Sequence, residues 1–144
     1  SGIPSDVEGR VAIARKIVER AEALGIPRED IIIDCLCLTI GANNTAGLVT
    51  LETIRRVREE LGVNQTLGAS NISYGLPNRE VLNRAFLALA IVNGLTCPTV
   101  DVAKVRPAVV SADLVLGRDN YALRYIKAYR AEEVAAAERA KAKE

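Results

Sequence analysis

The feature that most restricts the fold of this chain is an unbroken apolar run, DIIIDCLCLTI, at residues 30–40. A strand with one face in water alternates apolar and polar residues, whereas a strand covered on both faces is apolar throughout, as in parallel sheets. Residues 7–24 before the run and 48–61 after it repeat apolar side chains at the spacing of an amphipathic helix. The run therefore predicts a buried parallel strand between two helices.

The same alternation continues to the end of the chain. Residues 66–71, TLGASN, have strand character, and residues 95–101, LTCPTVD, predict a third strand in spite of Pro98. Helix–strand alternation at roughly 30 residues per unit indicates right-handed βαβ crossovers, so the predicted class is α/β with a parallel sheet. The remaining expected helices cover residues 77–93, 104–116 and 119–143.

Length and charge exclude several function classes. The chain has 144 residues, which is enough for one domain with a real core. Its formal net charge of +1 gives no electrostatic basis for binding nucleic acid or an anionic membrane, and an aromatic content of 3% disfavours a surface that stacks bases. No apolar run approaches the roughly 20 residues that cross a bilayer. We therefore expect neither a nucleic-acid partner nor a membrane partner.

Three cysteines bear on the compartment. Cys35, Cys37 and Cys97 are an odd number in apolar surroundings, which predicts reduced, buried thiols in a cytoplasmic protein. A Cys-x-Cys metal site is the alternative, but the chain has no His and no second Cys pair. We therefore expect no metal site.

Each predicted strand ends on a polar residue: Asp34, Asn71 and Asp101. Ligands of parallel α/β folds bind at the carboxyl ends of the strands, so the three residues form a candidate site on one rim. Asp34 is the most informative, because a carboxylate inside an apolar strand carries a desolvation cost unless it is paired. Structural alternatives are a capping or sheet-bridging carboxylate for Asp34, a turn residue or N-cap for Asn71, and a helix N-cap for Asp101, where it is favoured.

Neighbouring residues extend the candidate site. Ser70 precedes Asn71 at the predicted strand tip, and Tyr74 lies in the loop over the same rim. Tyr74 is either a pocket wall or a packing residue. Arg79, in the first turn of the next predicted helix, is either a ligand-binding group or a solvated helix charge.

These residues resemble a known family. The segment LGASNISYGLPNREVLNRAFLALAIVNGL is similar to the seventh-strand region of pterin-binding methyltransferases, in particular the methyltetrahydrofolate:corrinoid/iron–sulfur protein methyltransferases. IIIDCLCLTIG resembles their sixth strand, which ends in Asp, and ALRYIKAYR resembles their closing helix. The resemblance covers roughly residues 2–130. The folate domain of cobalamin-dependent methionine synthase shares the SNIS portion, and the GLPNR extension favours the corrinoid-protein branch.

The resemblance implies a TIM (β/α)8 barrel enzyme that moves a methyl group from N5 of methyltetrahydrofolate to the cobalt of a corrinoid (cobalamin) carried by a partner protein. Asp34 matches the strand-six carboxylate that binds the pterin, and a carboxylate accepts two adjacent N–H donors in bidentate fashion. Asn71 matches the strand-seven Asn near N5, where an amide can stabilise charge on the departing amine. Asn71 is thus the expected catalytic residue. The expected substrate-binding residues are Asp34, Ser70, Asn71, Tyr74, Arg79 and Asp101.

The match is incomplete in length. A complete barrel has eight strands and about 250 residues, whereas three strands are predicted here, corresponding to strands six to eight of the family. We therefore expect a carboxyl-terminal part of a pterin-binding barrel over residues 1–130 and a charged, alanine-rich helical tail over residues 131–144. The first strand then has an unpaired apolar edge, which predicts self-association or pairing with a missing amino-terminal half.

Two alternatives to methyl transfer remain. One is a non-catalytic half-barrel that binds pterin weakly or serves only in assembly, and its motive is the five absent strands. The other is a different pterin enzyme such as a dihydropteroate synthase. That family carries a Ser-Arg-Lys type motif and an Arg-x-His, whereas this chain has SNISY and TVDVA and no His, so we disfavour it.

Overall fold

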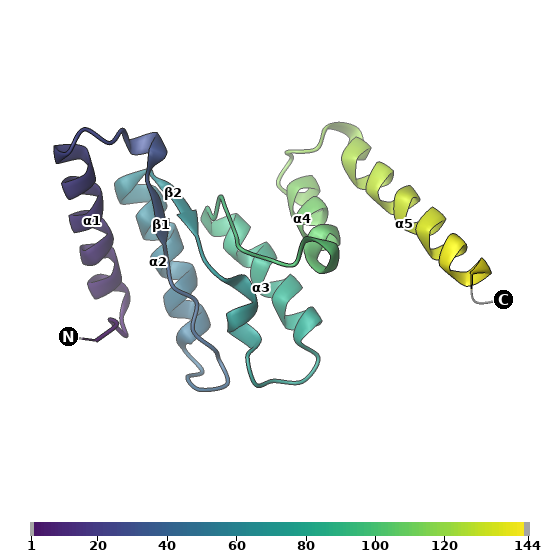
Figure 1. The fold of residues 1–144 in the computed structure, drawn as a ribbon, viewed down its shortest axis with the longest axis horizontal. Coiled ribbons are helices and arrows are strands. Elements are labelled where there is room, and N and C mark those ends of the chain that lie inside the picture. Colours follow the sequence, from purple (N-terminus) through teal and green to yellow (C-terminus); the bar gives the residue numbers. More distant parts are fainter. Residues whose placement is uncertain (1, 143–144) are drawn as a thin grey trace.

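The computed structural model describes residues 2–142 as an α/β chain with a small parallel sheet (Figure 1). Strands β1 and β2 are neighbours and pair in parallel, with Ile32 opposite Asn64 and Asp34 opposite Thr66. The predicted α/β class with parallel pairing is therefore confirmed. The strands are β1 (Ile32–Asp34) and β2 (Asn64–Thr66). The α-helices are α1 (Val7–Ala23), α2 (Ala46–Leu61), α3 (Arg79–Asn93), α4 (Val102–Val115) and α5 (Leu123–Lys141). Short 3₁₀ turns are η1 (Arg28–Asp30), η2 (Ala69–Ser73) and η3 (Asn120–Ala122).

The first strand is much shorter than the apolar run that predicted it. Regular pairing ends at Asp34, and Leu36 has a φ of 57°, in the left-handed region. The Asp34 carboxylate accepts a hydrogen bond from the Leu36 N–H at 2.8 Å, and this turn carries the chain off the sheet. Of the apolar residues that follow the strand, Cys35 and Cys37 are still buried and Leu38 is 39% exposed, so burial continues beyond the strand only in part.

The second strand lies earlier than predicted. Residues 64–66 form β2, whereas Ser70 and Asn71 lie in the 3₁₀ turn η2. The Asn71 N–H donates to the Gly68 carbonyl at 3.0 Å, and this i to i+3 bond closes the turn. Asn71 is therefore a turn residue beyond the strand, and the prediction that it ends a strand is wrong.

The predicted third strand at residues 95–101 is reduced to one parallel bridge between Gly68 and Thr99. The Cys97 N–H donates to the Gln65 carbonyl at 2.8 Å, and the Thr99 N–H donates to the Leu67 carbonyl at 2.9 Å. Because alternate residues of a parallel strand bond to the same neighbour, Pro98 lies where its missing N–H faces away from β2. The segment therefore pairs on one side only.

The core lies between the sheet and the helices on its outer face. Ile54 of α2, Leu67 after β2 and Leu87 of α3 are each 0% exposed. Helix α3 contacts α2, α4 and the turn η2, so it supports the polar turn from behind. Gly94 ends α3 with a φ of 110°, a conformation that side chains disfavour.

The carboxyl-terminal helix stands apart from this core. Helix α5 contacts α4 and the turn before it and extends away from the body of the chain (Figure 1). It runs continuously through residues 130 and 131, so the division into a barrel part and a tail stays a prediction. The last two residues of the predicted tail, 143 and 144, lie outside the described residues. Within residues 2–142, every helix is too short or too polar to cross a membrane.

The three thiols differ in exposure. Cys35 and Cys37 are buried as predicted, but Cys97 is exposed, because it lies on the singly paired segment. Burial raises the pKa of Cys35 to about 12 and that of Cys37 to about 11. Since the thiolate is the reactive form, we expect iodoacetamide at pH 8 to modify Cys97 alone in the folded chain and all three thiols in urea. Mass spectrometry of the peptides measures this, and native labelling of Cys35 or Cys37 would contradict it.

Candidate functional site

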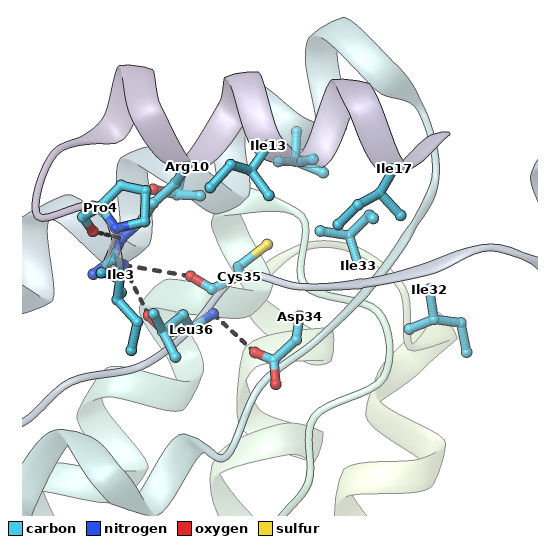
Figure 2. A pocket seen from close by; sticks show the side chains of 14 residues that line it. Ile3, Pro4, Arg10, Ile13, Ile17, Ile32, Ile33, Asp34, Cys35 and Leu36 are labelled. Carbon is cyan, nitrogen blue, oxygen red and sulfur yellow. Dashed lines mark hydrogen bonds between the residues drawn. The ribbon is translucent and has the colours of Figure 1, made fainter. Parts of the chain in front are cut away.

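Asp34 stands at the carboxyl end of β1 with its side chain in solvent. Ile33, on the other face of the strand, is buried against the helices, whereas Ile32 and Asp34 point to the opposite side (Figure 2). The expectation that Asp34 carries a desolvation cost is therefore wrong, since strand alternation turns it out of the core. An exposed carboxylate at a strand end is free to accept donors from a ligand.

Arg10 was missed by the sequence reasoning and shapes this corner of the rim. Its Nη1 donates to the Leu36 carbonyl at 2.8 Å and to the Cys35 carbonyl at 3.4 Å, and its Nε donates to the Pro4 carbonyl at 3.1 Å (Figure 2). Burial lowers the pKa of this guanidinium. The sequence could have indicated this buried position, because Arg10 lies four residues before Ala14 and therefore on the same inward face of α1.

We expect Arg10→Ala to lower the free energy of unfolding by about 1.5–3 kcal/mol, because three carbonyls lose a charged donor. Urea unfolding followed by circular dichroism measures the change. Arg15→Ala on the same helix is the control: Arg15 is an exposed residue that pairs with Glu60 at the surface, and we expect a loss below about 1 kcal/mol. Equal losses for the two variants would show that the Arg10 contacts add nothing.

Asn71 presents its side chain at the adjacent turn. The residue is exposed, and its Nδ2 lies 3.1 Å from the point that a Cβ on Gly68 would occupy. The amide therefore lies directly over the backbone of Gly68, and a larger residue at that position would push it aside. This turn holds the amide near the carboxyl end of β2.

Arg79 organises the same turn from the start of α3. Its Nη2 donates to the Ser70 carbonyl at 2.8 Å, and its Nε donates to the Ser73 hydroxyl at 3.1 Å. Its guanidinium lies 5.8 Å from the centre of the Tyr74 ring, a cation–π distance. The buried Ser73 hydroxyl also donates to Asn83 Oδ1 at 2.7 Å. These contacts fix the turn, while the Tyr74 side chain stays exposed.

Two hydrogen bonds join the loops that carry Asp34 and Asn71. Thr39 Oγ1 donates to the Tyr74 carbonyl at 2.7 Å, and the Ile40 N–H donates to the Ile72 carbonyl at 3.0 Å. Since β1 and β2 are also direct neighbours, the two polar side chains belong to adjacent, mutually bonded loops at one end of the sheet. That the two side chains face one ligand stays a prediction.

Asp101 occupies the N-cap position of α4, but its side chain makes no capping hydrogen bond, so its structural alternative holds for its position alone. Its carboxylate lies 3.7 Å from Lys104 Nζ, and with Ser70 it lines a small cavity of about 70 Å³ between η2, α3 and α4. Asp34 lines a different hollow, along the free edge of β1, and neither space is lined by Asn71. A cavity shared by Asp34 and Asn71 therefore stays a prediction.

Metal-ligating side chains do not cluster in the part of the chain that the structure describes. Within residues 2–142, no group of three or more His, Cys, Asp and Glu side chains lies close enough to hold a metal ion. The polar groups of the rim are carboxylates, amides, hydroxyls and an arginine, which suit hydrogen bonding to an organic ligand.

The fold and the rim together define a class: an α/β protein in which polar side chains gather at the carboxyl ends of adjacent parallel strands. Within that class, the chain belongs to the pterin-binding enzymes, because the family model described as "Pterin binding enzyme" matches residues 3–101. The resemblance stated from the sequence is therefore confirmed.

The chain is also similar in sequence to a named methyltransferase and to two named methionine synthases. The chain is 30% identical over 135 residues to the methylcorrinoid:tetrahydrofolate methyltransferase of Eubacterium limosum, a match that covers 90% of this chain and 49% of that protein. It is 37% identical over 117 residues to the methionine synthase of Mycobacterium tuberculosis, covering 71% of this chain and 10% of that protein. The methionine synthase of Mycobacterium leprae matches at 36%. The chain thus spans about half the length of the first relative and a tenth of the other two.

Proposed function

We propose that this chain forms part of an enzyme that transfers a methyl group between N5 of methyltetrahydrofolate and the cobalt of a corrinoid held by a partner protein. The observation that carries the proposal is that Asp34 and Asn71 lie on adjacent loops joined by hydrogen bonds, in a chain of the pterin-binding family. The names of its relatives, which pair tetrahydrofolate with a methylcorrinoid or denote methionine synthesis, support methyl transfer as the chemistry.

Asp34 is proposed to hold the pterin. The amino group and the adjacent ring N–H of a pterin are two parallel donors, and an exposed carboxylate can accept both. One Asp34 oxygen already accepts the Leu36 N–H, which orients the carboxylate, and each carboxylate oxygen has a further acceptor position. The Arg10 contacts to the Cys35 and Leu36 carbonyls hold the turn behind it.

Asn71 is proposed to act at N5. As the methyl carbon leaves, the electron pair of the C–N bond stays on nitrogen, which takes a proton from solvent, while cobalt(I) supplies the pair for the new bond and becomes cobalt(III). An amide N–H donated to N5 stabilises the charge that develops there. The reverse transfer, which the name of the Eubacterium limosum relative describes, uses the same contacts in the opposite order.

The other rim residues are proposed to shape the site. The exposed Tyr74 ring would form a wall of the pterin pocket, and Arg79 would hold that ring and the Ser70 carbonyl in place. Ser70 and Asp101 line the adjoining small cavity and would contact the rest of the folate. The free thiols Cys35, Cys37 and Cys97 are consistent with the cytoplasm as the compartment.

The fold is proposed to be the carboxyl-terminal part of a (β/α)8 barrel. The two parallel strands and the Gly68–Thr99 bridge would correspond to strands six to eight of that barrel. Residues 1–130 would supply this part, and residues 131–144 would extend it as a charged tail.

We expect Asp34→Asn to weaken methyltetrahydrofolate binding about 10- to 150-fold, because the amide keeps the acceptor for Leu36 but loses the bidentate charged contact. Isothermal titration calorimetry measures the dissociation constant. Asp30→Asn is the control, since Asp30 lies just before the opposite end of the same strand. Unchanged binding in Asp34→Asn, or an equal loss in Asp30→Asn, would end the pterin assignment.

A second candidate is a half-barrel that assembles or binds pterin without catalysis. The observation that favours it is that the described residues form two paired strands and one further parallel bridge, fewer than the eight strands of a complete barrel. Incubation of this chain alone with methyltetrahydrofolate and a corrinoid protein reduced to cobalt(I) separates the two. Methyl–cobalt formation would eliminate the second candidate.

A further inference from the structure

A buried hydroxyl lies two residues after Asn71. Ser73 is 0% exposed, whereas Asn71, in the same turn η2, is exposed to solvent. A hydroxyl inside a protein costs free energy unless it is hydrogen-bonded, and Ser73 has two partners on α3. It donates to Asn83 Oδ1 at 2.7 Å and accepts from Arg79 Nε at 3.1 Å. The Ser73 hydroxyl therefore joins the exposed turn to α3.

The hydrogen bonds of Ser73 have a fixed direction. An arginine side chain has donors and no acceptor, so Ser73 Oγ must accept from Arg79. The single hydroxyl proton is then left for an acceptor, and Asn83 Oδ1 at 2.7 Å is closer than the Ser70 carbonyl at 3.3 Å. The Asn83 side chain must therefore turn its oxygen toward Ser73. Position 83 thus requires an acceptor, which is a chemical requirement and not one of size alone.

The Arg79 guanidinium extends this chain of hydrogen bonds across Asn71. Its Nη2 donates to the Ser70 carbonyl at 2.8 Å, so Arg79 binds the residue before Asn71 and the second residue after it. The N–H and the carbonyl of Asn71 both take part in backbone hydrogen bonds that close the turn. A short turn directs its side chains through its backbone, so these contacts set where the Asn71 amide lies.

We propose that Ser73 and Asn83 are positioning residues that hold the Asn71 amide in place for methyl transfer. Neither residue needs to touch the folate. The inference rests on the proposed function, in which Asn71 donates to N5. Loss of the Ser73 hydroxyl removes one partner from Arg79 Nε and one from Asn83 Oδ1, within the contact between η2 and α3. The turn then has more freedom, and the amide is misplaced at the reacting nitrogen.

Such a misplacement affects the rate of transfer more than the affinity for folate. A displacement of a catalytic group by a fraction of an ångström slows the reaction, because the reacting atoms are no longer aligned. Pterin binding is assigned above to Asp34, which lies at the end of β1 on the other loop. The affinity should therefore depend little on Ser73.

The first measurement uses the ¹⁵N-labelled chain alone, without folate. Hydrogen exchange of the Asn71 and Tyr74 amides by NMR reports the opening of η2, because both N–H groups donate within the turn. Ser73→Ala should speed their exchange about tenfold. Thr53→Val is the matched control: Thr53 is 1% exposed on α2, where its hydroxyl donates to the Val49 carbonyl at 2.7 Å, and its loss should leave both amides unchanged.

The second measurement is single-turnover methyl transfer in the assembly that transfers methyl, together with the dissociation constant for methyltetrahydrofolate. Ser73→Ala and Asn83→Leu should each slow transfer about tenfold and change the dissociation constant less than about twofold. Asn83→Asp keeps an acceptor at the same size, so its rate should stay within about threefold of the unmodified protein. A role in packing alone predicts equal rates for Asn83→Leu and Asn83→Asp. Thr53→Val should leave the rate unchanged.

The outcomes separate the positioning role from the proposed function. Unchanged exchange in Ser73→Ala, equal rates in Asn83→Leu and Asn83→Asp, or a fall in rate matched by the same fall in affinity would each overturn the positioning role, even where Asn71→Ala slows transfer. A rate unaffected by Asn71→Ala would overturn the proposed role of Asn71, and the positioning role with it. Circular dichroism checks the fold of each variant, and Asn83→Leu, which should speed exchange of the same amides, carries both measurements if Ser73→Ala does not fold.

Discussion

Asn71→Ala is expected to slow methyl transfer by about 10²–10³-fold while the dissociation constant for methyltetrahydrofolate changes less than about threefold. Removal of one preorganised donor from a site of developing charge has an effect of this size. The amide lies over Gly68 on a closed backbone turn, so we propose that it is already in place when N5 gains charge. The loss should therefore fall on the chemical step, and single-turnover absorbance of the corrinoid measures it in the assembly that transfers methyl.

Two further variants make this result specific. Asn93→Ala removes an amide at the far end of α3, where Nδ2 donates to the Leu89 carbonyl at 2.9 Å, and should leave the rate unchanged. Gly68→Ala places a methyl group against the Asn71 amide and should slow transfer about tenfold, because a displaced catalytic group loses part of its effect. A rate unaffected by Asn71→Ala, or a fall in rate matched by the same fall in affinity, would remove Asn71 from the reaction.

The order of elements could be read from the sequence, because helix periodicity is a local property. The amphipathic spacing of residues 7–24 and 48–61 lies close to the bounds of α1 and α2. The end of β1 could not be read in this way. It depends on the Asp34 carboxylate and the Arg10 guanidinium, and the latter is joined to the strand only in the folded chain.

The candidate site also has features that the local sequence predicts and features that depend on tertiary contacts. The residue types at positions 34 and 71 predicted their chemical roles, which stay predictions, and the structure places the two residues on adjacent loops joined by hydrogen bonds. The 3₁₀ turn that carries Asn71 was missed, because strand character in TLGASN is a propensity that the Gly68–Asn71 bond overrides. The bond from Thr39 to the Tyr74 carbonyl spans 35 positions, and no local pattern predicts such a contact.

Leu87→Ala is expected to lower the free energy of unfolding by about 2–5 kcal/mol, the largest loss of stability among these variants. Leu87 is 0% exposed on α3, which packs against α2, α4 and the turn that carries Asn71. Truncation leaves a cavity behind that turn. The lost free energy of unfolding is a large share of the roughly 5–15 kcal/mol that stabilises a domain.

Leu89→Ala is the matched control for Leu87→Ala, two residues away on the same helix but 53% exposed, and it should cost less than about 0.5 kcal/mol. Urea unfolding by circular dichroism compares the two variants at equal slope. Because Leu87 supports η2 without lining the rim, its truncation should reduce the folded fraction at 37 °C and leave the pterin affinity of the folded protein unchanged. Equal losses in both leucine variants would mean that α3 is not packed on the core as described.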